Sequence, residues 1–218
     1  MACSQLNISI PKDKIHDLPT VTFDGEITVV DTLEAAEKAI AALSDETIVG
    51  FDTETKPTFR KGRGNPVALM QISTSDHGYL FRLNKIGFPE SLRHFIENPS
   101  IKKIGLSLKD DFFVMHRSSE FEPAGFVDLQ PFVREYAIID CSLQRIYAII
   151  FGMRISKSQR LSNWEAPKLT PAQQAYATID AWACLKIYNH LLHGQFHPEK
   201  SPYIVEPQLE EDKSAPQA

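Results

Sequence analysis

In the stretch Ile48-Val49-Gly50-Phe51-Asp52-Thr53-Glu54-Thr55, a short apolar run leads directly into two acids. Such a run is typical of a strand that is buried on both faces. Asp52 and Glu54 are two residues apart, so on a strand their side chains project from the same face. Carboxylates crowded in this way are unfavourable unless they are solvated or share a hard cation such as Mg²⁺. The stretch therefore predicts a buried strand with a metal-binding acid pair, or a strand that ends by Asp52 and leaves both acids in a solvated loop.

The segments around this stretch alternate between strand and helix patterns. Strand patterns cover residues 27–30, 48–51, 67–73, 79–83, 103–106 and 126–129, and helical patterns cover residues 32–43, 89–97, 108–116, 142–151 and 171–192. We expect Asp31 to cap the first helix and Thr170 to cap the last one. An early hairpin followed by βα units predicts an α/β fold with a mixed β-sheet flanked by α-helices.

The length of 218 residues and the hydrophobic content of 43% are sufficient for one large domain with a full core. We expect a polar, poorly ordered arm at residues 1–22, the folded domain at 23–197 and an acidic, disordered tail at 198–218. No apolar run has the length of a membrane span or the character of a signal peptide, so we expect an intracellular, cytoplasmic protein without a membrane partner. The three cysteines are far apart and form no C-x-x-C pair, so the sequence suggests neither a disulfide framework nor a cysteine zinc site.

The formal net charge of −5 is unevenly distributed along the chain. Residues 199–218 contain five acids and two lysines. By contrast, residues 55–66 contain no acid and four cations, namely Lys56, Arg60, Lys61 and Arg63. This basic loop is compatible with binding a phosphate backbone, although a simple solvated loop fits the charges equally well.

Two further segments carry candidate catalytic acids. Tyr176 and Asp180 are four residues apart in a predicted helix and therefore share a face. A phenol beside a carboxylate can orient or deprotonate a metal-activated water, but a half-buried tyrosine that only finds a hydrogen-bond partner shows the same pattern. Asp110 and Asp111 stand near the start of another predicted helix, where the helix dipole favours acids without any further role.

In their order along the chain, these motifs resemble the DEDD superfamily of 3′→5′ exonucleases, in the tyrosine-bearing (DEDDy) branch with ribonuclease D and the exonuclease domain of the Werner syndrome helicase. The resemblance covers residues 27–192 and is carried by residues 48–55, 67–73, 102–111, 161–164, 169–173 and 176–183. The spacing from Gly105 suits Asp111 rather than Asp110. Many relatives carry arginine before the proline that follows the tryptophan motif, whereas this chain has Ala166, so that basic substrate contact is missing or moves to Lys168.

The resemblance implies a ribonuclease-H-like fold and two divalent ions, Mg²⁺ or Mn²⁺, held by Asp52, Glu54, Asp111 and Asp180. It also implies that Tyr176 positions the attacking water and that the partner is a nucleic acid with a 3′ end, single-stranded or recessed. The chemistry agrees with this assignment. Hydrolysis of a phosphodiester develops charge on the phosphate and on the leaving oxygen, and two cations about 4 Å apart stabilise both.

Two other functions compete with this assignment. A phosphatase that forms a covalent aspartyl-phosphate also begins with an acid pair after an apolar strand, but its second acid is normally aspartate, and here it is Glu54. A nucleic-acid-binding module with the same fold and lost or weak catalysis is the second alternative. The presence of all five candidate residues argues against that module.

Several histidines and aromatic residues have a simpler interpretation. His190, His193 and His197 have helix-like spacing, but no cysteine or acid clusters with them, which disfavours a zinc site. We expect five phenylalanines to be core residues rather than base-stacking platforms, namely Phe81, Phe88, Phe95, Phe112 and Phe113. For Trp164, in a polar loop beside the predicted site, both roles stay open.

Overall fold

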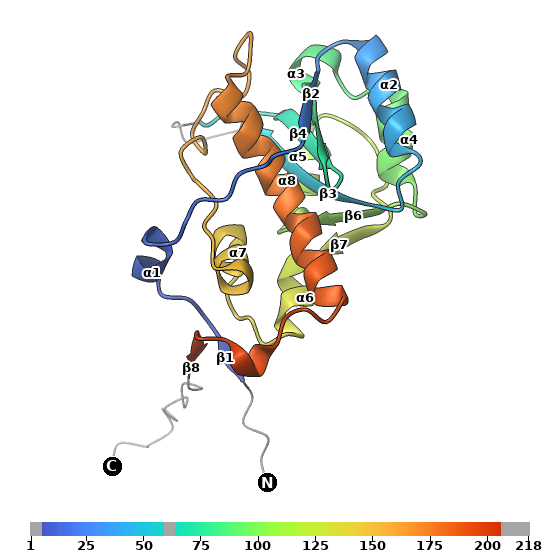
Figure 1. Cartoon of the computed structure of the whole chain (residues 1–218). Helices are drawn as coiled ribbons and strands as arrows, with labels where there is room; N and C mark the ends of the chain where they lie inside the picture. Colours follow the sequence, from blue (N-terminus) through green and yellow to red (C-terminus); the bar gives the residue numbers. More distant parts are fainter. Residues whose placement is uncertain (1–5, 59–63, 206–218) are drawn as a thin grey trace, which may run out of the picture.

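A mixed six-stranded sheet with the order β2-β5-β4-β3-β6-β7 forms the centre of the computed structural model, which describes residues 6–58 and 64–205 (Figure 1). The strands are β2 (Glu26–Val30), β3 (Ile48–Thr55), β4 (Val67–Ser73), β5 (His77–Phe81), β6 (Lys102–Gly105) and β7 (Phe126–Asp128). β4 runs antiparallel to β3 and β5, whereas β2 is parallel to β5, and β3, β6 and β7 are parallel to one another. The predicted mixed sheet is thereby confirmed.

Helices cover both faces of this sheet. They are α1 (Lys12–His16), α2 (Leu33–Leu43), α3 (Leu83–Ile86), α4 (Glu90–Glu97), α5 (Leu108–Met115), α6 (Leu129–Arg134), α7 (Leu143–Phe151) and α8 (Pro171–Leu192), with a short 3-10 turn at Pro198–Lys200. α8 crosses one face, where it packs on β3, β4, β5 and β6 and is flanked by α6 and α7 (Figure 1). Buried residues of α2, α4 and α5 pack with Val49 and Phe51 on the other face. The sheet is therefore buried on both sides along β3.

The close approach of α8 to β3 positions the candidate site. A capping box starts the helix: Thr170 accepts a hydrogen bond from the backbone N–H of Gln173 at 3.2 Å, and Pro171 occupies the first turn. At the contact, a Cβ atom on Gly50 would lie only 2.0 Å from the carbonyl oxygen of Ala181. Only glycine permits this approach, which brings α8 close to the strand face that carries Asp52.

The N-terminal segment differs from the expected disordered arm. β1 (Asn7–Ile8) pairs with β8 (Ile204–Val205) in a small antiparallel sheet. Ile8, Ile10, Ile15 and Val21 are buried in one cluster with residues of α6, α7 and α8. The prediction of a poorly ordered arm is therefore wrong for residues 6–22, because these four side chains bury apolar surface against the helices. The predicted disordered tail is likewise wrong for residues 198–205, which form the 3-10 turn and β8. Residues 1–5 and 206–218 lie outside the described residues.

Smaller differences concern a helix cap and one aromatic side chain. Thr32 rather than Asp31 caps α2, since its hydroxyl accepts from the Ala35 N–H at 3.1 Å, while Asp31 pairs with Lys85 at 2.9 Å. Four of the five phenylalanines pack in the core as predicted, but Phe113 is 70% exposed.

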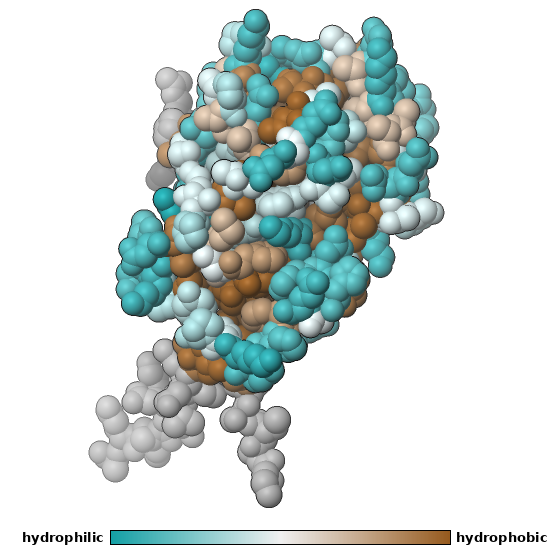
Figure 2. Space-filling model, in the orientation of Figure 1, coloured by the Kyte–Doolittle hydropathy of each residue, from teal (hydrophilic) through white to brown (hydrophobic). Residues whose placement is uncertain are grey.

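The surface of the molecule is mixed in character. Figure 2 shows hydrophilic and hydrophobic side chains intermixed on the face over α8. None of the helices in residues 6–58 and 64–205 is long and apolar enough to cross a membrane.

Candidate active site

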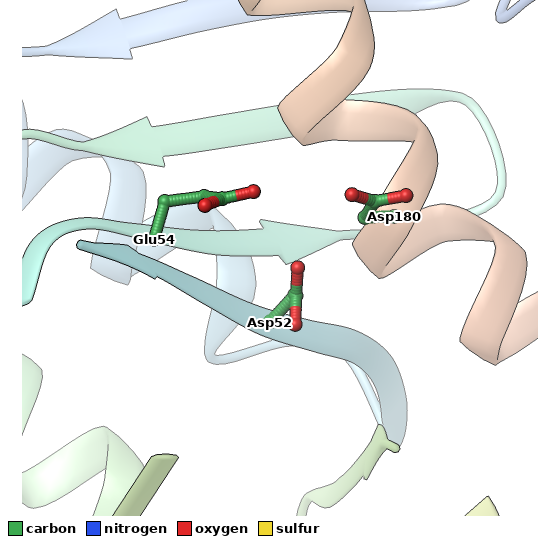
Figure 3. Close-up of side chains that lie close together, drawn as sticks. All are labelled: Asp52, Glu54 and Asp180. Atoms are coloured by element: carbon green, nitrogen blue, oxygen red, sulfur yellow. The ribbon is translucent and has the colours of Figure 1, made fainter. Parts of the chain in front are cut away.

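β3 and α8 bring three carboxylates together. β3 continues through Asp52 and Glu54, so both side chains lie on its α8 face, and the alternative that they belong to a solvated loop is wrong. Asp180 reaches the same space from α8 (Figure 3). Each of the three offers an oxygen ligand, and these oxygens lie within 4.8 Å of one another. Oxygens this close to one another can coordinate the same cation.

Burial and mutual repulsion make this group unfavourable in its ionised form. Burial and the charge of Asp180 raise the pKa of Asp52 well above its ordinary value. Burial, followed by the charges of Asp180 and Asp111, raises the pKa of Glu54 to about 8. Burial raises the pKa of Asp180 to about 7 despite the opposing effects of the Tyr176 hydroxyl and Lys157. At neutral pH the cluster therefore favours either protons or cations.

Asp111 approaches the cluster from α5 and is held by a residue that the sequence patterns did not single out. The Thr53 hydroxyl donates a hydrogen bond to a carboxylate oxygen of Asp111. Burial is the main cause that raises the pKa of Asp111, to about 6. Asp110 instead is exposed and accepts from the Ser107 hydroxyl at 2.9 Å. Of the two neighbours, Asp111 is thus the one turned toward β3, although it lies outside the group of three carboxylates.

Tyr176 and Trp164 form the aromatic side of the site. Burial, and then the charges of Asp180 and Glu54, raises the pKa of Tyr176 above its ordinary value, so the phenol is protonated at neutral pH. The Trp164 ring is fully buried with its centroid 5.9 Å from that of Tyr176, which makes it a core residue and not a base-stacking platform. Its indole N–H has no hydrogen-bond acceptor within the described residues, yet lies near enough to Glu54 to lower the pKa of that carboxyl.

Buried Arg82 holds the loop that carries Trp164. Its guanidinium donates to the carbonyl oxygens of Pro167 at 3.1 Å, of Trp164 at 3.5 Å and of Ala166. The backbone of Ala166, where many relatives carry arginine, is therefore fixed by an arginine from another part of the chain. Only the spatial arrangement shows this role, because nothing in the local sequence around Arg82 points to the loop.

A cavity of about 170 Å³ opens beside the carboxylates. Asp52, Tyr176 and Asp180 form part of its lining, together with the exposed cation of Lys157. Lys157 was not among the sequence candidates, although a lysine in the polar loop before the tryptophan motif was a usable signal. Its ammonium group places a positive charge near the buried acids and opposes the rise in the pKa of Asp180.

Other predicted features lie apart from this site or outside the described residues. In the part of the chain that the structure describes, the group Asp52–Glu54–Asp180 is the sole cluster of three potential metal ligands, so the three histidines do not assemble a zinc site. In the basic loop, Lys56 pairs with Glu165 at 3.1 Å. The other three cations of that loop, Arg60, Lys61 and Arg63, are outside the described residues.

Comparisons with known proteins agree with this geometry. The family model described as 3′-5′ exonuclease matches residues 27–193. The bifunctional 3′-5′ exonuclease/ATP-dependent helicase WRN of Mus musculus is 33% identical over 195 residues, which cover 84% of this chain but only 14% of the mouse protein.

Two solved structures share the fold. The EXO domain of Aedes aegypti Nibbler superposes with a TM-score of 0.72 at 22% identity and covers 83% of this chain and 96% of that domain. Escherichia coli RNase D gives a TM-score of 0.69 at 23% identity, with 77% of this chain and 44% of RNase D covered. The chain therefore has the ribonuclease-H-like arrangement of a mixed sheet flanked by helices.

Proposed function

The chain belongs to the 3′-5′ exonuclease family, whose members hydrolyse nucleic acid, and we propose that it acts by a two-metal-ion mechanism with the residues of the carboxylate cluster. The observation that carries the proposal is the group of Asp52, Glu54 and Asp180, whose oxygens lie within 4.8 Å of one another in a buried setting. A cation is the natural means of keeping such a group ionised at neutral pH.

The donor set fits divalent ions of the hard type. Asp52, Glu54, Asp180 and the neighbouring Asp111 offer only carboxylate oxygens, which Mg²⁺ and Mn²⁺ accept as ligands. When bound, such ions stabilise the charge that develops on the phosphate and on the leaving oxygen. Thr53 keeps Asp111 beside β3 through its hydrogen bond, so that the fourth carboxylate adjoins the other three.

Tyr176 orients the attacking water in this proposal. It precedes Asp180 by one helical turn, and its pKa is raised, so its hydroxyl stays protonated and acts through hydrogen bonding rather than as a base. Packing against the buried Trp164 ring fixes the direction of the phenol. This role assigns the chain to the tyrosine-bearing branch of the superfamily.

The proposed substrate is a single-stranded or recessed 3′ end from which nucleotides are removed one at a time. The family description supports the direction of attack. The chain spans only 14% of the length of the mouse protein. Whether ribose or deoxyribose is preferred depends on contacts to the 2′-hydroxyl, which a direct comparison of substrates measures.

The test is degradation of 5′-labelled single-stranded RNA, single-stranded DNA and recessed duplex in Mg²⁺, in Mn²⁺ and in EDTA. We expect a ladder that shortens from the 3′ end in either ion and no cleavage in EDTA. Asp52→Asn keeps the size of the side chain and removes its charge, and we expect it to lower turnover by roughly 10³-fold or more. Cleavage in EDTA, or near-normal turnover of Asp52→Asn, contradicts the mechanism. Binding without cleavage by the wild-type protein identifies a binding module instead.

A further inference from the structure

The most exposed large hydrophobic side chain among the described residues lies on the helix that carries Asp111. Phe113 in α5 is 70% exposed, although its neighbour Phe112 packs in the core. A single exposed hydrophobic residue is common on protein surfaces and carries no function by itself. The surroundings of Phe113 therefore decide its meaning.

Two cations flank Phe113. Lys109 precedes it by four residues and shares its face of α5, and Arg117 lies in the turn just beyond the end of the helix at Met115; we call these three side chains the α5 face. Lys109 is exposed and makes no ion pair within the described parts of the chain. Arg117 donates to the carbonyl oxygen of Gly64 at 2.7 Å, which directs it toward the end of the basic loop. The α5 face thus presents cation, aromatic ring and cation in one row.

We propose that the α5 face binds the single-stranded part of the nucleic-acid substrate, with Phe113 stacked on a base and Lys109 and Arg117 against phosphates. The proposal rests on the proposed function, because the strand must leave the carboxylate site in some direction. Proteins that hold single strands without sequence preference combine a row of cations with aromatic stacking surfaces. In a chain with a net charge of −5, a local row of this kind is what draws in a polyanion.

The position of the face specifies which nucleotides it contacts. Asp111 and Phe113 are two residues apart and therefore point about 200° apart around α5. The width of a helix, about 10–12 Å with its side chains, thus separates the two groups. Phe113 therefore stacks on a base upstream of the scissile bond and not on the terminal nucleotide. The exposed carboxylate of Asp110 lies near Phe113 and repels phosphates. The phosphates of the bound strand therefore contact Lys109 and Arg117, on either side of Phe113.

Binding of fluorescent single-stranded oligonucleotides to the Asp52→Asn protein in Mg²⁺ tests the stacking contact without cleavage. Stacking predicts that an added Phe113→Ala change weakens binding by roughly 5- to 150-fold and that Phe113→Trp restores it. Leu33→Ala, which truncates a side chain that is 59% exposed on α2, is the matched control and leaves binding unchanged. An unfolded variant is recognised by its circular dichroism, and Phe113→Leu then serves as the milder replacement.

Two further readouts separate stacking from general surface effects. The first readout uses a series of oligonucleotides, each with one abasic nucleotide at a different position. Phe113→Ala should no longer weaken binding when the abasic nucleotide is the upstream one that stacks on Phe113. Lys109→Ala reduces the slope of binding against salt by about 0.7, whereas Lys14→Ala on α1 does not change it. Wild-type affinity of Phe113→Ala for every oligonucleotide overturns the proposal, even if the wild-type protein is an active exonuclease. If wild-type protein binds through this face but never cleaves, the proposed function fails and the α5 face stands.

Discussion

Tyr176 gives the sharpest test at the scale of single residues, because its ring and its hydroxyl have separable roles. Its ring packs near Trp164, and its hydroxyl lowers the pKa of Asp180. Tyr176→Phe keeps the packing and removes only the hydroxyl. We expect kcat to fall by roughly 10²- to 10⁴-fold, with substrate binding nearly unchanged, in single-turnover cleavage with Mg²⁺.

The control for this change is Tyr188→Phe, a buried tyrosine further along the same helix. Tyr188→Phe should retain the wild-type cleavage rate, because Tyr188 is not part of the candidate site. If Tyr176→Phe also cleaves at the wild-type rate, the Tyr176 hydroxyl has no part in the mechanism, and the residue has a structural role alone.

Asp110 and Asp111 provide an internal comparison between neighbours. Neighbouring helix residues point about 100° apart, and it is Asp111 that contacts Thr53 on β3. We expect Asp111→Asn to abolish metal-dependent cleavage and Asp110→Asn to retain most of it. Titration of each variant with Mn²⁺ should show weakened ion binding for Asp111→Asn alone. The opposite order of effects shifts the ligand by one residue and contradicts the geometry of α5.

The carboxylates were predictable from the sequence, whereas their supports were not. Spacings of two on a strand and four on a helix are local rules, and they identified Asp52, Glu54 and Asp180 as residues of shared faces. Thr53 and Asp111 are 58 positions apart, and Arg82 and Ala166 are 84 apart. Contacts of this kind depend on how elements pack, and no local periodicity encodes them.

The contact between α8 and β3 dominates at the scale of elements. Gly50→Ala places a methyl group 2.0 Å from the backbone oxygen of Ala181, so the helix must move away from the strand. Overpacking of this kind costs about 1–3 kcal/mol, which urea denaturation measures as a lower midpoint. Because Asp180 adjoins Ala181, we also expect turnover to fall.

Gly152 at the end of α7 is the matched glycine for that experiment. It has a left-handed conformation with open space around its Cβ position, and asparagine tolerates this conformation. Gly152→Asn should therefore change stability by less than about 1 kcal/mol and leave turnover intact. If Gly50→Ala behaves in the same way, the close approach does not constrain the site.

In the whole molecule, the hydrophobic core extends beyond residues 23–197, the segment that the sequence patterns predicted to be folded. The patterns of α8 and of the strand pairs were long and regular enough to predict a mixed sheet with helices. The segment at residues 7–21 has apolar residues scattered among polar ones, and only its packing against α6, α7 and α8 reveals Ile8 and Ile10 as core. Packing against these helices, rather than any local sequence pattern, thus makes residues 7–21 part of the folded domain.

The carboxylate cluster links the stability of the whole molecule to pH and to metal ions. Burial and mutual repulsion raise the pKa of Glu54 to about 8 and that of Asp180 to about 7 in the folded protein. A carboxyl group with a raised pKa binds its proton more tightly when the chain is folded. Its contribution to stability is therefore lost as pH rises from about 4, the unfolded pKa, through the folded value.

We accordingly expect Mg²⁺ to raise the free energy of unfolding more at pH 8 than at pH 5.5, because the ion replaces protons that are lost over this range. Urea denaturation in Mg²⁺ and in EDTA at both pH values measures this difference. In EDTA at pH 8, Asp52→Asn should be more stable than the wild-type protein, since one buried charge is removed from a repelling group. The same variant should also show a smaller stabilisation by Mg²⁺. A Mg²⁺ effect that is equal at both pH values and unchanged in Asp52→Asn places the ion elsewhere on the protein and contradicts the site.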